Sequence, residues 1–333
     1  MSSLCKNLGL VLLLLAVVVI LYGAYVRLTD AGLGCPDWPG CYGQLTAPSP
    51  DKPTVVEDSP LVFDAVEIGK AWREMIHRYL ASALGFGILV LALLTWTVRR
   101  KNRYSSKVPY ILLPLVVFQG VLGMWTVTLL LKPLVVTAHL LGGLATLSIL
   151  YWYFLSCRYA VAVVPQDKKL NILAWFGLFI VVSQVFLGGW TSTNYAALAC
   201  TELPRCHGLW LPLEQLDSAF VLWRGLGVNY EFGVLDTPAR VSIHVVHRIG
   251  AVVVTLFLGF LVWRTLRCEL SQVRKIGLAI GSALLLQLSL GIANVLGGLP
   301  IFVAVGHNGG AGLLLLTIVS LIYFTSRRDA HGL

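Results

Sequence analysis

Apolar runs long enough to cross a lipid bilayer dominate this chain of 333 residues. A transmembrane helix needs about 20 consecutive apolar residues. Five long runs contain no charged residue, and two more carry titratable side chains only near their starts. The uncharged runs are residues 8–26, 108–131, 133–157, 170–200 and 276–326, and the other two are 74–96 and 241–263. Because residues 297–300, Gly-Gly-Leu-Pro, divide the last run, the pattern predicts eight transmembrane helices.

The second half of the chain repeats the pattern of the first. Gly23 and Gly188 precede the cysteine pairs of their halves at an offset of 165 residues, and His77 and His247 are 170 apart. The pairs Gln119/Gln287, Gly123/Gly291 and His139/His307 share an offset of 168. A unit with an even number of spans enters the membrane in the same orientation in both copies, which relates them by an axis along the membrane normal.

These observations predict the fold class. We expect an all-α membrane protein whose eight transmembrane helices form two tandem four-helix bundles, residues 1–160 and 161–333, related by pseudo-twofold symmetry along the membrane normal. Two long outer loops, residues 27–73 and 191–240, are too long for plain connectors and are expected to be functional. Residues 207–239 have no clear counterpart in the first half.

Composition and charge agree with a membrane location. The chain is 57% hydrophobic and only 12% charged, far from the average of soluble domains. If the N-terminus is inside, most Lys and Arg lie in the inner segments, which predicts cytoplasmic N- and C-termini. The net charge of +9 then reflects topology and contact with the lipid bilayer, and we expect no nucleic-acid partner.

The N-terminal run predicts the type of membrane. It lacks a preceding basic cluster and a following Ala-x-Ala cleavage site, so we expect it to remain as a helix. No Arg/Ser-rich presequence precedes it either. We therefore expect a multi-pass protein of a prokaryotic plasma (inner) membrane.

Four histidines in two matched pairs are the main chemical signal. His139 lies six residues after Pro133 and His307 seven after Pro300, so both are roughly 10 Å inside their helices. His77 and His247 lie a similar distance inside theirs. Two imidazoles at equal depth suit the axial ligation of haem iron between helices. A single intramembrane histidine would more simply be a polar contact between helices.

The residues next to these histidines distinguish the two halves. Glu74 lies one helical turn before His77, where the second half has His244. A carboxylate near a haem edge can accept a proton or stabilise developing positive charge, or it can simply pair with Arg73 or Arg78. Arg78 and Arg248 directly follow a histidine and are candidate contacts for haem propionates, the alternative being side chains that extend to the membrane surface.

Two cysteine pairs share one spacing. Cys35 and Cys41, like Cys200 and Cys206, are separated by five residues in outer loops, where disulfides persist. We expect each pair to close a small loop or to cycle between dithiol and disulfide. The spacing is not typical of zinc sites.

Several motifs together resemble the haem A synthase family, and the resemblance covers nearly the whole chain. In the first half they are residues 32–43 (Gly-Leu-Gly-Cys-Pro-Asp-Trp-Pro-x-Cys-Tyr-Gly), 74–79 (Glu-x-x-His-Arg-Tyr) and 119–128 (Gln-x-x-Leu-Gly-x-Trp-Thr-Val-Thr). In the second half they are His247-Arg248 and the run from Leu299-Pro300 to His307-Asn308. The family's outer-loop cysteine pairs are both matched.

The resemblance implies a specific activity. Members of the family oxidise a methyl group of haem O to the formyl group of haem A by two successive hydroxylations, after which the hydrated intermediate loses water. Carried over to this chain, His77 and His139 would ligate the substrate haem O. His247 and His307 would ligate a haem b cofactor that passes electrons on, and Glu74 matches the family's essential acid. Partnership with a haem O synthase and a homo-oligomeric state are further implied possibilities.

Other functions fit parts of this pattern. A di-haem b electron carrier would use the four histidines but would not need Glu74 opposite His244. A quinone-linked thiol oxidase would use the outer cysteine pairs and need no haem. A transporter with duplicated halves would place its polar groups at mid-depth instead of near one face.

Overall fold

The computed structural model describes residues 3–48, 67–101, 107–159 and 167–326. These residues form eight long helices and one short helix, joined by loops. The eight long helices are apolar enough to cross a membrane, so the prediction of eight spans in an all-α protein is confirmed. They are α1 (Ser3–Leu28), α2 (Ile68–Lys101), α3 (Val108–Thr128), α4 (Pro133–Arg158), α5 (Lys168–Thr193), α7 (Thr237–Leu266), α8 (Ser271–Leu296) and α9 (Ile301–Thr325). The short helix, α6 (Leu216–Ala219), lies in the second outer loop and was not predicted.

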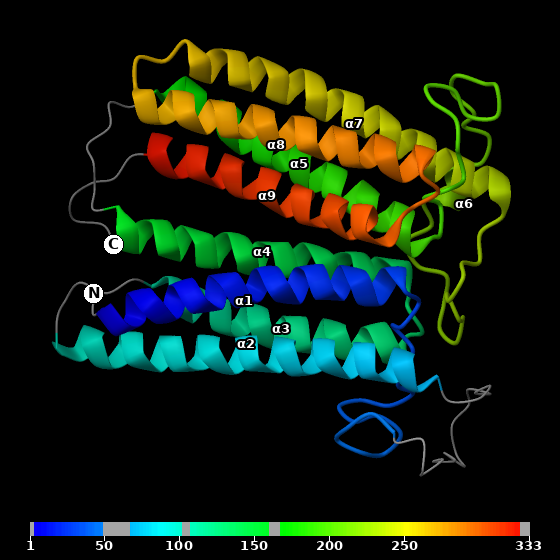
Figure 1. Ribbon diagram of the computed structural model, residues 1–333, viewed down its shortest axis with the longest axis horizontal. Coiled ribbons are helices and arrows are strands. Elements are labelled where there is room, and N and C mark those ends of the chain that lie inside the picture. The colour runs from blue at the N-terminus through cyan, green and yellow to red at the C-terminus, as the bar shows by residue number, and fades with distance from the viewer. Residues whose placement is uncertain (1–2, 49–66, 102–106, 160–166, 327–333) are drawn as a thin grey trace.

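Each half of the chain packs as a group of four helices (Figure 1). In the first half α1 and α3 both pack against α2 and α4, and in the second half α5 and α8 both pack against α7 and α9. The helices that carry the histidines, α2 with α4 and α7 with α9, are therefore diagonal partners across their groups. The halves meet where α1 packs on α9 and α4 packs on α5 and α9.

The relation between the halves stays a prediction in two respects. The pseudo-twofold axis is an inference from the repeated motifs. The predicted boundary between residues 160 and 161 falls in residues 160–166, outside the described residues.

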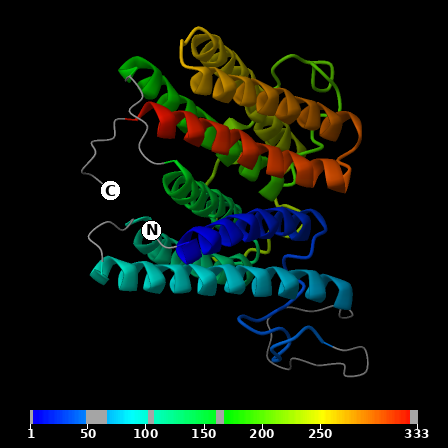
Figure 2. The ribbon, with the colours of Figure 1, turned by 60° about the vertical axis from the view of Figure 1, so that its left-hand side comes forward.

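The start of α1 and the end of α9 lie at one end of the bundle, whereas α6 and the cysteine-bearing loops lie at the other (Figures 1 and 2). Assigning the first end to the cytoplasm rests on the distribution of Lys and Arg. Part of that evidence, Arg327 and Arg328, lies outside the described residues.

Two of the four histidine-bearing helices, α2 and α7, begin earlier than predicted. Their apolar runs start at Glu74 and Val241, but the helices start at Ile68 and Thr237. Asp236 caps α7 by accepting a hydrogen bond from the Ala239 amide at 3.2 Å, which is a common start signal for a helix. The first turns of both helices are too polar to be recognised as part of an apolar run. Because the helices begin earlier, His77 and His247 lie about three turns from the helix starts.

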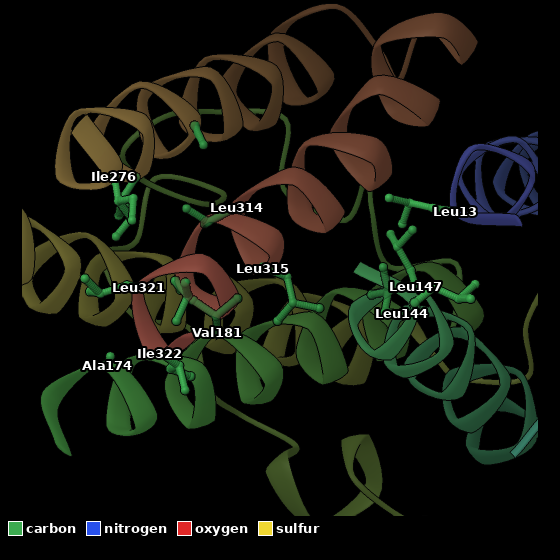
Figure 3. Close-up of a cluster of buried hydrophobic side chains, with 14 of the residues drawn as sticks. Leu13, Leu144, Leu147, Ala174, Val181, Ile276, Leu314, Leu315, Leu321 and Ile322 are labelled. Atoms are coloured by element: carbon green, nitrogen blue, oxygen red, sulfur yellow. The ribbon is translucent and has the colours of Figure 1, made fainter. Parts of the chain in front are cut away.

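A continuous cluster of buried aliphatic side chains joins the two halves. Figure 3 shows Leu13, Leu144 and Leu147 of the first half near Leu315 of the second. In lipid, helices are held together largely by close packing at small residues and by interhelical hydrogen bonds. Both occur here: the Tyr151 and Ser320 hydroxyls are 2.8 Å apart across the α4–α9 contact, and Gly189 of α5 lies against α4.

Replacing Gly189 by leucine should weaken the contact between the halves. A Cβ atom at Gly189 would lie 3.0 Å from Thr137 Cγ2 and 3.3 Å from Leu140, and overpacking of this kind costs about 1–3 kcal/mol. We expect a lower midpoint of thermal unfolding in detergent. The matched control is Gly259→Leu, because a Cβ at Gly259 meets no atom within 4 Å. Equal midpoints for the two variants would contradict this description of the contact.

Candidate functional site

His77 of α2 and His139 of α4 meet across the first group of helices. Their ring centroids are 6.5 Å apart and the ring planes are 85° to each other. Imidazole nitrogens bind first-row transition metals at about 2 Å, so two rings that share one metal have centroids about 6 Å apart. The observed separation therefore suits one metal held between the two rings.

His247 of α7 and His307 of α9 form the corresponding pair in the second half. They come from the same two positions in their group of helices as His77 and His139 do in theirs, and they are close enough to interact electrostatically. The structure thus brings each predicted pair together within its own half.

A glycine of a neighbouring helix lies against every one of these imidazoles. A Cβ at Gly23 would come within 2.8 Å of His77 Cε1, and one at Gly291 within 3.1 Å of His307 Cε1. Gly123 faces His139 and Gly188 faces His247 in the same way, at 3.6 and 3.3 Å. These four glycines therefore leave room for the imidazole rings.

The donor set fits haem iron better than a bare metal ion. In the part of the chain that the structure describes, no three His, Cys, Asp or Glu side chains are placed so that they could hold a metal ion together, whereas a protein-bound zinc ion generally needs three or four protein ligands. Haem iron takes only axial ligands from the protein. Among the residues that the structure describes, the buried Nδ1 atoms of His77, His139 and His307 have no hydrogen-bond partner.

Glu74 is buried, at 5% exposure, and ties α2 to the first disulfide loop. Its Oε2 accepts a hydrogen bond from the Cys35 amide at 2.9 Å, and its Oε1 pairs with the Arg78 guanidinium. The pairing with Arg78 was the simpler alternative expected for this acid. The bond to Cys35 was not expected, because nothing in the sequence indicates that the loop folds back onto this turn of α2.

Both cysteine pairs form disulfides, Cys35–Cys41 and Cys200–Cys206, and cycling between dithiol and disulfide stays a prediction. An arginine holds each loop through backbone carbonyls. Arg78 donates to the carbonyls of Asp37 at 3.0 Å, Pro39 at 3.2 Å and Gly40. Sequence reasoning missed this role, and the contact with haem propionates stays a prediction.

The second half uses a different side chain in the place of Glu74. His244 is also buried, and its Nδ1 is 2.9 Å from the Ala196 carbonyl. Arg248 donates to the Cys200 carbonyl at 2.8 Å and to the Arg205 carbonyl at 3.1 Å. In both halves an arginine therefore holds the disulfide loop through backbone carbonyls. At the position of Glu74 and His244, only the first half has a buried carboxylate.

Tyr42 completes the surroundings of the acid on the loop side. It is buried next to the disulfide. Burial raises the pKa of its phenol, and the charges of Glu74 and Asp37 raise it further. Tyr42 therefore stays neutral near Glu74 at physiological pH.

Residues 221–235, here called the crossing segment, connect the second half to the first. The Lys132 ammonium, in the turn between α3 and α4, donates to the Gly225 carbonyl and lies 3.4 Å from the centre of the Trp223 ring. The Tyr230 amide donates to the Leu130 carbonyl at 3.1 Å. The part of the outer loop without a counterpart in the first half thus packs on the turn that leads into the His139 helix.

Comparisons with known proteins agree on one family. The family model COX15-CtaA, described as "Cytochrome oxidase assembly protein", matches residues 6–319. A "Heme A synthase" of Shewanella oneidensis is 46% identical over 315 residues, which cover 94% of both chains. Proteins of the same name are 25% identical over 327 residues in Halalkalibacterium halodurans, covering 94% of both chains, and 26% identical over 332 residues in Rickettsia felis, covering 93% of this chain and 94% of the relative.

Replacing Arg78 by lysine should loosen the first disulfide loop. Lysine cannot reproduce the guanidinium fork that reaches several carbonyls and Glu74 together, and one hydrogen bond to a charged group is worth about 1.5–3 kcal/mol. We expect at least about tenfold faster amide hydrogen exchange at Cys41 and Gln44, which bond to each other across the loop. The control is Arg73→Lys, because Arg73 bonds only to Gly69 of its own helix among the hydrogen bonds described. Unchanged exchange in the Arg78 variant would contradict the anchoring role.

Proposed function

Because this chain belongs to the COX15-CtaA family of cytochrome oxidase assembly proteins, we propose that it is a haem A synthase. It would oxidise the methyl group of haem O to the formyl group of haem A, a net four-electron oxidation in which two C–H bonds are replaced by one C=O bond, with the oxygen atom from water, four protons released and the electrons passed to an external acceptor. The observation that carries the proposal is the His77–His139 pair, whose ring centroids are 6.5 Å apart, next to Glu74, a buried acid on the helix that bears His77.

The first half is the proposed substrate site. His77 and His139 would hold haem O by its iron, with Gly23 and Gly123 leaving room for the two rings. Support for choosing this half comes from Glu74, since the second half has a histidine in its place. A reaction that removes hydrogen from carbon needs a nearby group to take up protons, and a cofactor site does not.

The second half is the proposed cofactor site. His247 and His307 would hold haem b, and when bound this group supplies a one-electron redox centre within the same protein. The two sites would lie close to the contact between α4 and α5, where Thr137 packs on Gly189. Thr137 is two residues before His139. Gly189 directly follows Gly188, which lies against His247.

Glu74 is held in one place by its own partners. The Cys35 amide fixes one oxygen and Arg78 the other, so the carboxylate is anchored before substrate arrives. Preorganised groups of this kind accept protons or stabilise developing charge without the cost of reorganisation. We propose that Glu74 receives a proton released during oxidation of the methyl carbon.

The Glu74→Gln variant should separate binding from chemistry. Glutamine keeps an oxygen for the Cys35 amide but cannot accept a proton as carboxylate does, and loss of a general base costs about 100- to 10,000-fold in rate. We expect bound haem to stay at the wild-type level while haem A formation falls by that factor. Glu67→Gln is the control, since Glu67 lies at the start of the same helix and pairs only with Lys70 among the ion pairs described. Wild-type haem A formation by Glu74→Gln would remove Glu74 from the mechanism.

The alternative functions predict other outcomes in companion variants. His247→Ala should lose haem b and product together. If product persists without any bound haem, a thiol-linked reaction at the outer disulfides becomes the better description. If wild-type protein binds haem b at both pairs and makes no haem A, a di-haem electron carrier is the better description.

A further inference from the structure

Gln184 of α5 gives His247 a hydrogen-bonding partner at Nδ1, the ring nitrogen that has no partner in the other three paired histidines among the residues that the structure describes. The Gln184 amide nitrogen is 3.1 Å from His247 Nδ1 and donates to the His247 carbonyl at 2.9 Å. The Nδ1 atoms of His77, His139 and His307 have no such partner in the described structure. The two haem sites therefore differ in how their ligand rings are supported.

Space for this amide depends on Gly250, one turn after His247. A Cβ at Gly250 would collide with Gln184 Oε1. By the offsets that align Gly188 with Gly23 and His247 with His77, the first-half counterparts of Gln184 and Gly250 are Val19 and Leu80. The first half thus replaces the amide and the glycine that accommodates it with two apolar side chains.

A second glutamine–glycine arrangement occurs in both halves and does not distinguish them. Gln119 of α3 lies against Gly142 of α4, and Gln287 of α8 lies against Gly310 of α9. Gln287 also comes within 3.3 Å of His307 Nε2. Of these intramembrane glutamines, only Gln184 is specific to one half.

The chemistry of a ligating imidazole explains why this partner matters. A histidine that binds iron through Nε2 carries its hydrogen on Nδ1, and an acceptor there fixes the ring orientation and raises the basicity of the ligand. Gln184 Oε1 is buried and without a partner. A half-turn of the amide would bring this oxygen to Nδ1–H, in exchange for the hydrogen bond that the NH₂ group now donates to the His247 carbonyl.

We propose that Gln184 is a positioning residue that makes the second half a retaining site for a resident haem, whereas Val19 and Leu80 leave the first half as an exchange site for haem substrate and product. The proposal rests on the proposed function, because it assumes that both pairs bind haem. It concerns affinity and exchange, and assigns Gln184 no part in the oxidation itself.

Haem transfer to apomyoglobin tests this directly in detergent-solubilised full-length protein. In a His77→Ala background, which leaves only the second-half site, Gln184→Val should lose haem about 10- to 100-fold faster, the usual effect of removing such a partner. Ser183→Ala is the control, because Ser183 is an exposed neighbour that bonds only to the Phe179 carbonyl of its own helix among the bonds described. The reciprocal change, Val19→Gln with Leu80→Gly in a His247→Ala background, should slow the loss of haem O from the first half.

A conservative variant separates positioning from a merely structural role. Gln184→Glu keeps an acceptor for Nδ1–H and makes it stronger, so we expect haem retention with a lower reduction potential than in the wild type. Haem loss from Gln184→Val at the rate of the Ser183 control, or an unchanged potential in Gln184→Glu, would overturn the inference and leave the proposed function intact. If His77→Ala removes the haem b that His247→Ala retains, the assignment of haem b to the second half fails, and this inference fails with it.

Discussion

The separation of two imidazoles across a helix bundle is the constraint on which the rest of this structure depends. His77 and His139 come from helices that do not pack on each other, and their centroids are nevertheless only 6.5 Å apart. This requires glycine at the positions where the intervening helices approach the rings, as at Gly23 and Gly123. The helices thus leave room for two imidazole rings between them, which explains why glycines and histidines repeat together along the chain.

Each half of the chain has one histidine pair, and a few positions next to the pairs differ between the halves. On the loop side, the first half has Glu74 where the second has His244, and only the carboxylate connects to the disulfide loop through the Cys35 amide. Toward the membrane interior, the second half has Gln184 where the first has Val19. One half therefore carries the acid and the other carries the extra support for a ligand ring. This division suits a pair of haems of which one reacts and one remains bound.

The sequence predicted the spans, the histidine pairs and the cysteine pairs because each follows from local pattern or from repetition. Length and apolarity define a span, and a constant offset identifies matching residues. The sequence could not predict that Arg78 holds the backbone of the 35–41 loop, since carbonyl partners leave no trace in side-chain identity. The same holds for the bond between Lys132 and the crossing segment, which joins residues far apart in the chain. The early starts of α2 and α7 were missed because their first turns are too polar to register as apolar runs.

Chromatography of the haems extracted from purified protein tests the central claim most directly. The protein would be produced in cells with and without a source of haem O, in the wild-type form and as the His77→Ala and His247→Ala variants. We expect haem b in both conditions, joined by haem O, its hydroxylated forms or haem A only when haem O is supplied, with each variant losing the haem of its own half. Haem b alone in both conditions, or haem unaffected by either histidine variant, would contradict it.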